Sequence, residues 1–280
     1  MGQLTFLNLP IGNVSDITGR SLEALKQAGI FVVEDTRSFK ALLGYLKIDF
    51  SNKQIFSLHD QSHANDVKKI GDLLDTNDQI FYCSEAGSPI ISDPALPLIT
   101  MAIERGHKID TFSGISSPIA ALELSGLPCH PFTFLGFLAR EKGKLEKMFS
   151  GLAGQSTYVF FESPHRIIET LSIASDCLPL AKFAVCREIS KLYQSVYRFS
   201  GSEFINLKSE IVQKGEFVVV LYLPPEAGLQ SAKLGENGKK LSELSQEILE
   251  RGPHKKTVAK LIAQILGMDV SEVYKKLSSG

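Results

Sequence analysis

Five loops of this chain gather small, charged and proline residues, and each follows an apolar run. They read PIGN at 10–13, EDTR at 34–37, SLHD at 57–60, SEAGSP at 84–89 and SGISSP at 113–118. Small residues let the backbone approach a ligand closely, while carboxylates, hydroxyls and arginine supply charge and hydrogen bonds. These residue types suit a site that holds a polar ligand against main chain and keeps acids available for proton transfer.

The EDTR loop places two acids and an arginine at the end of a hydrophobic run. Uncompensated charge at that position is costly, so these side chains either pair with one another or serve a ligand. The simpler interpretation is a helix cap by Asp35 or Thr36 with a local ion pair. The residues alone leave both interpretations open.

A similar cluster, FESPHR, occupies residues 161–166 in the second half of the chain. Ser163 suits a helix N-cap with Pro164 at the first helical position. A cap of this kind leaves Glu162, His165 and Arg166 unexplained. A third polar cluster follows a later strand and comprises Arg187, Glu188 and Lys191.

Several familiar sites are disfavoured by spacing. The chain has no G-x-x-x-x-G-K-[ST] loop and no G-x-G-x-x-G after its first strand, which argues against the usual forms of ATP hydrolysis and dinucleotide binding. Ser116 stands as in a nucleophile elbow, but Pro118 replaces the glycine that permits the tight turn. His59 and His63 are four apart, yet His59 ends a predicted strand, so we expect no metal site. We interpret the scattered cysteines as buried thiols: Cys83, Cys129, Cys177 and Cys186.

Apolar runs typical of strands alternate with helical patterns through the first half of the chain. The predicted strands, each followed by a predicted helix, cover 4–9, 30–34, 54–59, 79–84 and 108–112. Five such units predict a mostly parallel five-stranded sheet with helices on both faces. Ligands of open sheets bind beyond the carboxyl ends of the strands. The five loops are therefore expected at the same edge of this sheet.

The pattern changes after residue 125. Strands are predicted at 132–138, 156–162, 182–189, 193–201 and 216–225, with helices at 140–152 and 165–178. The short connection before residue 193 predicts a hairpin, and therefore a mixed sheet. The fold class is α/β: an N-terminal domain with the parallel sheet, a second α/β domain with the mixed sheet, and a linker with a short helical C-terminal tail. These three parts are predicted at 1–125, 126–225 and 226–280.

Composition restricts the class of protein. The chain has 280 residues, of which 44% are hydrophobic, enough for sizeable cores. A net charge of -1 argues against a surface coated with basic charge, so a polyanion must be met by local patches such as 140–144 and 254–256. No apolar run reaches the roughly 20 residues of a membrane span, and the first residues lack a signal-peptide pattern. We therefore expect a cytoplasmic protein that does not enter a membrane.

Seven segments, taken in order, resemble the motifs of one family. They are LPIGNVSDIT, VEDTR, SEAGSPIISDP, SGISSPIAALELSGLP, FLGFLAREKGK, FFESPHRIIETL and REISKLY. They resemble the ribosomal RNA small-subunit methyltransferase I family, a branch of the S-adenosylmethionine-dependent tetrapyrrole methylases. The resemblance covers nearly the whole chain. It implies 2′-O-methylation of a cytidine ribose in 16S ribosomal RNA, with the RNA or the assembled small subunit as partner, and a homodimer.

The resemblance also implies that S-adenosylmethionine lies in the cleft between the two domains. The residues then expected to bind it are Pro10, Gly12, Ser84, Glu85, Ala86, Gly87, Ser88, Pro89, Ile90, Asp93, Gly114, Ser116 and Phe161. Ala86 and Gly87 lack side chains that would block the backbone from the cofactor. Ser84, Ser88 and Ser116 offer hydrogen bonds to its polar groups.

The chemistry asks little covalent help from the protein, because the sulfonium is already an activated methyl donor. The enzyme must align a ribose hydroxyl and exclude water, and a positioned base would help this weak nucleophile. The candidate catalytic residues are Glu34, Asp35, Arg37, His165 and Glu188. The candidate RNA-binding residues are Asn13, Arg37, Arg166, Lys191, Lys255 and Lys256.

Two alternatives remain open from the sequence. A small-molecule methylase of the tetrapyrrole type would share the cofactor loops but would not use the basic clusters or the helical tail. A non-catalytic RNA-binding paralogue would keep the basic residues without needing the cofactor loops.

Overall fold

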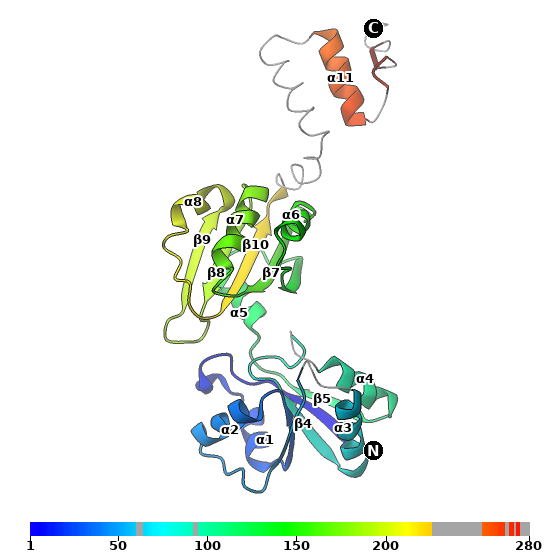
Figure 1. Cartoon of the computed structure of the whole chain (residues 1–280), viewed down its shortest axis with the longest axis vertical. Helices are drawn as coiled ribbons and strands as arrows, with labels where there is room; N and C mark the ends of the chain where they lie inside the picture. Colours follow the sequence, from blue (N-terminus) through cyan, green and yellow to red (C-terminus); the bar gives the residue numbers. More distant parts are fainter. Residues whose placement is uncertain (60–63, 92–94, 226–253, 267–268, 272, 275–280) are drawn as a thin grey trace.

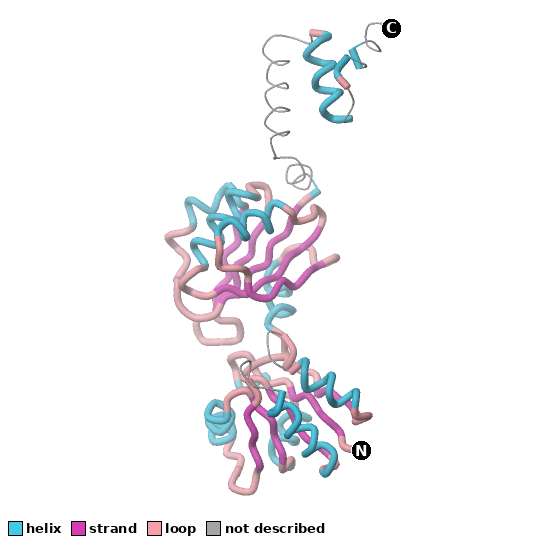
Figure 2. Tube along the Cα trace, turned by 45° about the vertical axis from the view of Figure 1, so that its right-hand side comes forward, coloured by secondary structure: helices cyan, strands magenta, loops and turns pink. Residues whose placement is uncertain are grey.

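The computed structural model describes residues 1–59, 64–91, 95–225, 254–266, 269–271 and 273–274. Two five-stranded sheets, each with its own helices, follow one another along the long axis of the molecule (Figure 1). Figure 2 shows the strands of each sheet in magenta between cyan helices. The α/β fold class with one parallel and one mixed sheet is confirmed.

The first sheet is parallel throughout. Its strands are β1 (Gln3–Leu7), β2 (Ile30–Val33), β3 (Gln54–Ser57), β4 (Gln79–Cys83) and β5 (Lys108–Phe112). Their order is β3-β2-β4-β1-β5. The connection after β1 therefore runs toward one edge of the sheet, and the connection after its neighbour β4 runs toward the other edge. The helical segments that follow these strands are η1 (Val14–Asp16), α1 (Gly19–Gln27), α2 (Thr36–Tyr45), α3 (Ala64–Thr76) and α4 (Leu96–Glu104).

Alternation along β4 shows why this sheet needs helices on both faces. Ile80 and Tyr82 pack into the core beneath α3 and α4, whereas Phe81 and Cys83 pack into the core beneath α1 and α2. Successive side chains of a strand point to opposite faces, so a strand with no polar alternation is buried on both sides. The carboxyl ends of the strands then carry the polar loops.

The second sheet is mixed, in the order β6-β7-β10-β8-β9. Its strands are β6 (Phe132–Phe137), β7 (Ser156–Glu162), β8 (Lys182–Arg187), β9 (Ser195–Ser200) and β10 (Phe217–Leu223). β6 is parallel to β7, and the remaining pairs are antiparallel. The predicted hairpin is confirmed as β8–β9. The helices of this part are α6 (Lys142–Ser150), α7 (Ile167–Cys177), η2 (Gly201–Glu203) and α8 (Phe204–Leu207).

Helix α5 (Ser117–Ser125) follows the last strand of the first sheet but packs on the second sheet. Ala121 of this helix lies in one core with Val159, Ala184 and Val220. The helix thus carries the chain from one sheet to the other, and its N-terminus remains at the level of the first sheet's loops. The domain boundaries at residues 125 and 225 stay a prediction.

The C-terminal part contains α11 (Lys255–Leu266), whose Ala259 and Ala263 pack against Val273. Residues 226–253 of the predicted linker and tail lie outside the described residues. No helix in the described ranges has the length and apolar character needed to cross a bilayer.

Candidate active site

Two adjoining cavities lie where the loops of the first sheet meet the second sheet. The larger has a volume of about 460 Å³ and the smaller of about 340 Å³. Both are lined by Ile11, Glu34, Glu85, Ala86 and Glu216. A site with two compartments and a shared wall can hold two ligands side by side.

Besides the residues shared with the smaller cavity, three parts of the chain line the larger one. The loop after β4 contributes Gly87 and Ser88, the start of α5 contributes Ser116, and the second sheet contributes an apolar wall. This wall contains Phe137, Phe161, Ile189, Phe217 and Val218. An apolar concave wall with a few polar groups is the usual character of a small-molecule site, and the volume falls in the usual range of about 300–1,000 Å³.

Gly87 lets the loop after β4 fold back onto the end of β1. Its N–H donates to the Leu9 carbonyl at 2.8 Å, and its own carbonyl accepts from the Leu9 N–H at 3.2 Å. This geometry places Gly87 at φ +70°, in the left-handed region that favours glycine. A Cβ atom there would lie 3.2 Å from Cγ2 of Ile11. The backbone of the loop is therefore held at the cavity wall with no side chain in front of it.

The predicted serines divide into two roles. The Ser84 hydroxyl is buried and donates to the carbonyls of Ala86 and Gly87, at 3.2 and 3.3 Å, so it holds the loop itself. Ser88 accepts a 2.9 Å hydrogen bond from Asn8, whose Cβ would lie 2.7 Å from a Cβ on Gly114. Ser116 begins α5 without a capping hydrogen bond from its side chain. Its hydroxyl is available to a ligand in the larger cavity.

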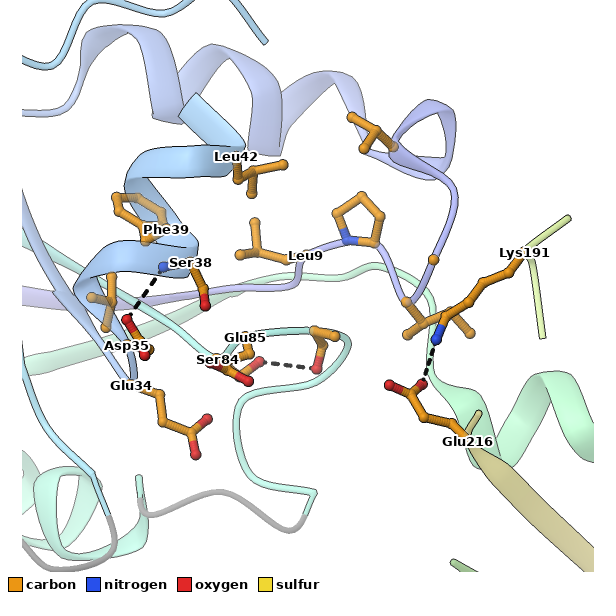
Figure 3. Close-up of a pocket in the computed structure, with 16 residues that line it drawn as sticks. Leu9, Glu34, Asp35, Ser38, Phe39, Leu42, Ser84, Glu85, Lys191 and Glu216 are labelled. Atoms are coloured by element: carbon orange, nitrogen blue, oxygen red, sulfur yellow. Dashed lines mark hydrogen bonds and ion pairs between the residues drawn. The ribbon is translucent and has the colours of Figure 1, made fainter. Parts of the chain in front are cut away.

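The smaller cavity extends along the loop after β1 and the start of α2. Figure 3 shows its lining, with the Glu34 side chain directed into the open space and away from α2. Pro10 and Gly12 line this cavity and not the larger one. Lys191 and Glu216 close it from the second sheet, joined by an ion pair of 2.9 Å.

Asp35 caps α2. Its carboxylate accepts hydrogen bonds from the backbone N–H groups of Arg37 and Ser38, at 2.6 and 3.2 Å. These two hydrogen bonds hold the pKa of Asp35 below its usual value. The capping interpretation of the EDTR loop is confirmed for Asp35, while the neighbouring Glu34 lines both cavities. Arg37 is exposed on the first turn of the helix.

Glu188 organises the second-sheet side of the cleft. Its Oε1 accepts from the Glu216 backbone N–H at 2.9 Å and from Lys191 Nζ at 3.1 Å. Partial burial would raise the pKa of Glu188, but these two hydrogen bonds outweigh it and the pKa lies below its usual value. A Cβ on Gly215 would lie 2.5 Å from its carboxyl carbon. This carboxylate lines neither cavity, and its contacts position Lys191.

The FESPHR cluster differs from the prediction. Helix α7 begins at Ile167 after Arg166, and Ser163 is not its N-cap, so that expectation was wrong. The Glu162 carboxylate accepts hydrogen bonds in this turn, from the Ser163 N–H at 2.8 Å and from the Thr170 hydroxyl at 2.6 Å. The Arg166 N–H, which a Ser163 cap would have bound through its hydroxyl, donates to the Ser163 backbone carbonyl at 3.1 Å.

Arg166 is also engaged within the fold. Its guanidinium donates to the Ala139 carbonyl at 2.7 Å and lies 3.4 Å from the Glu162 carboxylate. It therefore fastens the end of β6 to β7. His165 is exposed in the turn before α7 and lines neither cavity.

The remaining predicted residues that the structure describes line neither cavity. Asn13 caps η1 by accepting from the Ser15 N–H at 3.0 Å. Ile90 is half exposed and, like Pro89 and Gly114, is not part of either lining. Asp93 lies outside the described residues. Lys255 and Lys256 are the first residues of α11.

Sequence reasoning missed the contribution of β10. Gly215, Glu216, Phe217 and Val218 line the larger cavity, although the last two look like ordinary core strand residues. The only local signal was the Lys-Gly-Glu turn at 214–216, in which Gly215 has φ +86°. Ile11, Ser117, Pro118, Phe137 and Ile189 were also missed as lining residues.

Comparison with known proteins gives consistent relatives. The family model described as Tetrapyrrole (Corrin/Porphyrin) Methylases matches residues 3–205. Ribosomal RNA small subunit methyltransferase I of Vibrio cholerae is 34% identical over 270 residues, which cover 95% of this chain and 91% of the relative. The protein of that name from Thermotoga maritima is 34% identical over 221 residues, 79% of this chain and 98% of the relative.

Solved structures share the fold. Diphthine synthase superposes with a TM-score of 0.59 at 16% identity, covering 82% of this chain and 95% of that chain. Uroporphyrin-III C-methyl transferase from Thermus thermophilus, complexed with S-adenyl homocysteine, gives a TM-score of 0.54 at 13% identity, covering 79% and 97%.

Proposed function

The chain belongs to the tetrapyrrole methylase family and is an S-adenosylmethionine-dependent methyltransferase, and we propose that its acceptor is a ribose 2′-hydroxyl of a cytidine in 16S ribosomal RNA. The names of the curated relatives support a ribosomal acceptor. The observation that carries the proposal is the position of Glu34. Like Glu85 and Glu216, Glu34 lines both cavities, and its side chain is directed into the open space of the smaller one (Figure 3). It therefore stands between the proposed cofactor compartment and the proposed acceptor compartment.

The larger cavity fits S-adenosylmethionine, which supplies an activated methyl group when bound. The absence of a side chain at Gly87 lets the cofactor approach the loop after β4 closely, while the N–H and carbonyl of Gly87 itself remain paired with Leu9. The Ser116 hydroxyl, which makes no capping bond, adds a side-chain partner. Phe161 and Val218 offer an apolar surface to a planar base.

Glu34 is the proposed general base. Its carboxylate accepts the proton of the 2′-hydroxyl as the oxygen takes the methyl group, so the nucleophile never develops a full unshielded charge. Asp35 is less suited to this step, because its carboxylate already accepts two backbone hydrogen bonds as the cap of α2. Glu188 lines neither cavity, and its proposed role is to hold Lys191 in place.

The smaller cavity is the proposed acceptor compartment. Arg37 lies exposed on the first turn of α2, whose Ser38 lines that cavity, and can contact phosphates near the acceptor. The basic residues of α11, Lys255 and Lys256, are proposed to add further contacts to RNA. The family relationship supports a homodimer that works in the cytoplasm.

The test is methyl transfer to small subunits from cells that lack the activity. Wild-type protein and S-adenosylmethionine with a labelled methyl group are incubated with these subunits, and the RNA is digested to nucleosides for mass spectrometry. The expected product is 2′-O-methylcytidine at one position, with no transfer to subunits that already carry the modification. Label in a base, in ribosomal protein or in an added tetrapyrrole would overturn the proposed acceptor and leave the methyltransferase assignment intact.

A further inference from the structure

The β8–β9 connection, residues 188–194, is an unusually strained loop. Glu188 and Ser190 have φ values of +53° and +66°, in the left-handed region that residues with side chains rarely adopt. Backbone of this kind persists only where the surroundings hold it, and it concentrates at functional sites. The strain therefore raises the question of what this loop presents.

Hydrogen bonds from several directions fix the loop. Arg187 donates to the Tyr193 carbonyl at 3.0 Å and to the Lys214 carbonyl at 2.6 Å. The Gln194 side chain accepts from the Ser190 N–H at 2.7 Å. The Ser190 hydroxyl also donates to the Asp16 carboxylate, which belongs to the first-sheet side of the cleft. The loop is thus preorganised and tied to both halves of the molecule.

This rigid loop exposes two adjacent large hydrophobic side chains. Leu192 is 88% exposed and Tyr193 is 69% exposed. Neither belongs to a hydrophobic core, and the Tyr193 ring makes no aromatic contact within the described part of the chain. Lys191, the residue before them, lines the smaller cavity. The apolar pair therefore stands at the rim of the proposed acceptor compartment.

The opposite rim carries positive charge. Arg37 and Lys40 are both exposed on the first two turns of α2, next to Ser38 of the cavity lining. Helix α2 lines the smaller cavity through Ser38 and Leu42. The compartment thus has a cationic rim on one side and an aromatic–aliphatic rim on the other. This combination complements a nucleic acid strand, which offers phosphates and base faces together.

We propose that Leu192 and Tyr193 form a stacking platform for the base next to the methylated nucleotide. This inference rests on the proposed RNA acceptor. A compartment of about 340 Å³ has room for little more than the acceptor nucleotide, so the neighbouring nucleotides must lie at its rim. Unstacked RNA bases bind on aromatic side chains held at a rigid surface. Tyr193 is then a positioning residue that fixes the strand while Glu34 faces the acceptor hydroxyl.

The experiment compares Tyr193→Ala, Tyr193→Phe and Leu192→Ala with wild type and with Ile205→Ala. Ile205 is 64% exposed on α8 and lines neither cavity, so it controls for the loss of an exposed apolar side chain. Initial methylation rates are measured against small-subunit concentration, cofactor Kd by calorimetry and molecular mass by light scattering. We expect Tyr193→Ala to raise the KM for subunits roughly tenfold, with kcat and cofactor Kd unchanged. Tyr193→Phe should retain the wild-type KM, Leu192→Ala should raise it less, and Ile205→Ala should leave it unchanged.

Three results would overturn the platform. They are an unchanged KM in Tyr193→Ala, an equal loss in Tyr193→Phe, and a change in molecular mass that shows the pair to be a contact between copies of the chain. If the wild-type protein methylates no subunit, the proposed function is wrong and the proposed platform is wrong as well. The wild-type measurement alone identifies that outcome.

Discussion

Lys191 passes so close to Gly12 that a Cβ atom on Gly12 would lie 2.4 Å from the Cγ atom of Lys191. The Ile189 carbonyl would lie 3.0 Å from the same point. This contact joins the loop after β1 to the β8–β9 connection at one side of the smaller cavity, which both residues line. The fit of the two halves at this point depends on the absence of a side chain at residue 12.

Gly12→Ala should therefore displace Lys191 and break its ion pairs with Glu188 and Glu216. We expect a loss of stability of about 1 kcal/mol, typical of a local clash that a flexible side chain can partly relieve, and a lower rate of RNA methylation. Urea unfolding and subunit methylation measure the two effects. Gly19→Ala is the control, because a Cβ there meets no atom within 4 Å. Equal stability and equal methylation rates in the two variants would show that the contact between Gly12 and Lys191 is unimportant.

Gly87→Ala should lower both stability and cofactor affinity. The left-handed backbone at φ +70° costs a residue with a Cβ about 1–2 kcal/mol, and the added carbon lies 3.2 Å from Ile11 at the cavity wall. Gly106→Ala separates these effects, because Gly106 has φ +74° with no atom within 4 Å of the new Cβ. Calorimetry with S-adenosylmethionine should show weakened binding only for Gly87→Ala. Equal cofactor affinity in the two variants would remove Gly87 from the cofactor wall.

Glu34→Gln and Asp35→Asn should differ sharply. Removing a general base lowers turnover by about 10²–10⁴-fold, while cofactor and subunit binding remain. Asparagine caps a helix about as well as aspartate, so Asp35→Asn should keep both fold and turnover, whereas Asp35→Ala should cost about 1 kcal/mol of stability. Single-turnover methylation and thermal unfolding make the comparison. Retained turnover in Glu34→Gln would remove this residue from the chemistry.

Stability should depend on pH through Glu188. Its pKa is lowered in the folded state, because hydrogen bonds from the Glu216 backbone and Lys191 outweigh the effect of partial burial. Its stabilising contribution is therefore fully present above the unfolded pKa of about 4.3 and is lost as pH falls through the lower folded pKa. Urea unfolding at pH 7 and below pH 4 should show a smaller acid-induced loss in Glu188→Gln than in wild type. Glu210→Gln, at an exposed residue, should follow the wild-type profile.

Truncation after Pro225 should spare cofactor binding and weaken RNA engagement. The cavity linings contain no residue beyond Val218 in the described part of the chain, whereas α11 begins with Lys255 and Lys256. Loss of phosphate contacts reduces the dependence of affinity on salt. Subunit binding across a salt series compares the truncated and intact proteins. An unchanged salt slope and unchanged methylation would assign the tail another role.

The sequence alone was sufficient for the parallel sheet and for the family. Strands buried on both faces, such as β4, show a nearly continuous apolar run, so local composition predicts the parallel sheet. Ligands of such sheets bind beyond the carboxyl ends of the strands, which predicts the edge that carries the site. The family and the cofactor were predicted from contiguous motifs, and the comparisons confirm them. A cap by Asp35 or Thr36 was one of the two interpretations that the sequence left open, because a cap depends on hydrogen bonds to residues two and three positions along the chain.

Tertiary structure decided which of the clustered polar residues face the cavities. Arg166 and Glu188 have the side chains of a catalytic site, yet they line neither cavity and find partners within the second half of the fold. Glu162 lines the larger cavity, although its carboxylate also accepts a hydrogen bond from Thr170. Glu216 belongs to both cavity walls, although only the Lys-Gly-Glu turn at 214–216 marks it in the local sequence. Such assignments depend on contacts between residues far apart in the chain, where charged groups compete for the nearest partner of opposite charge or the nearest backbone donor. Local pattern specifies the elements, but only their packing determines which side chains face a cavity.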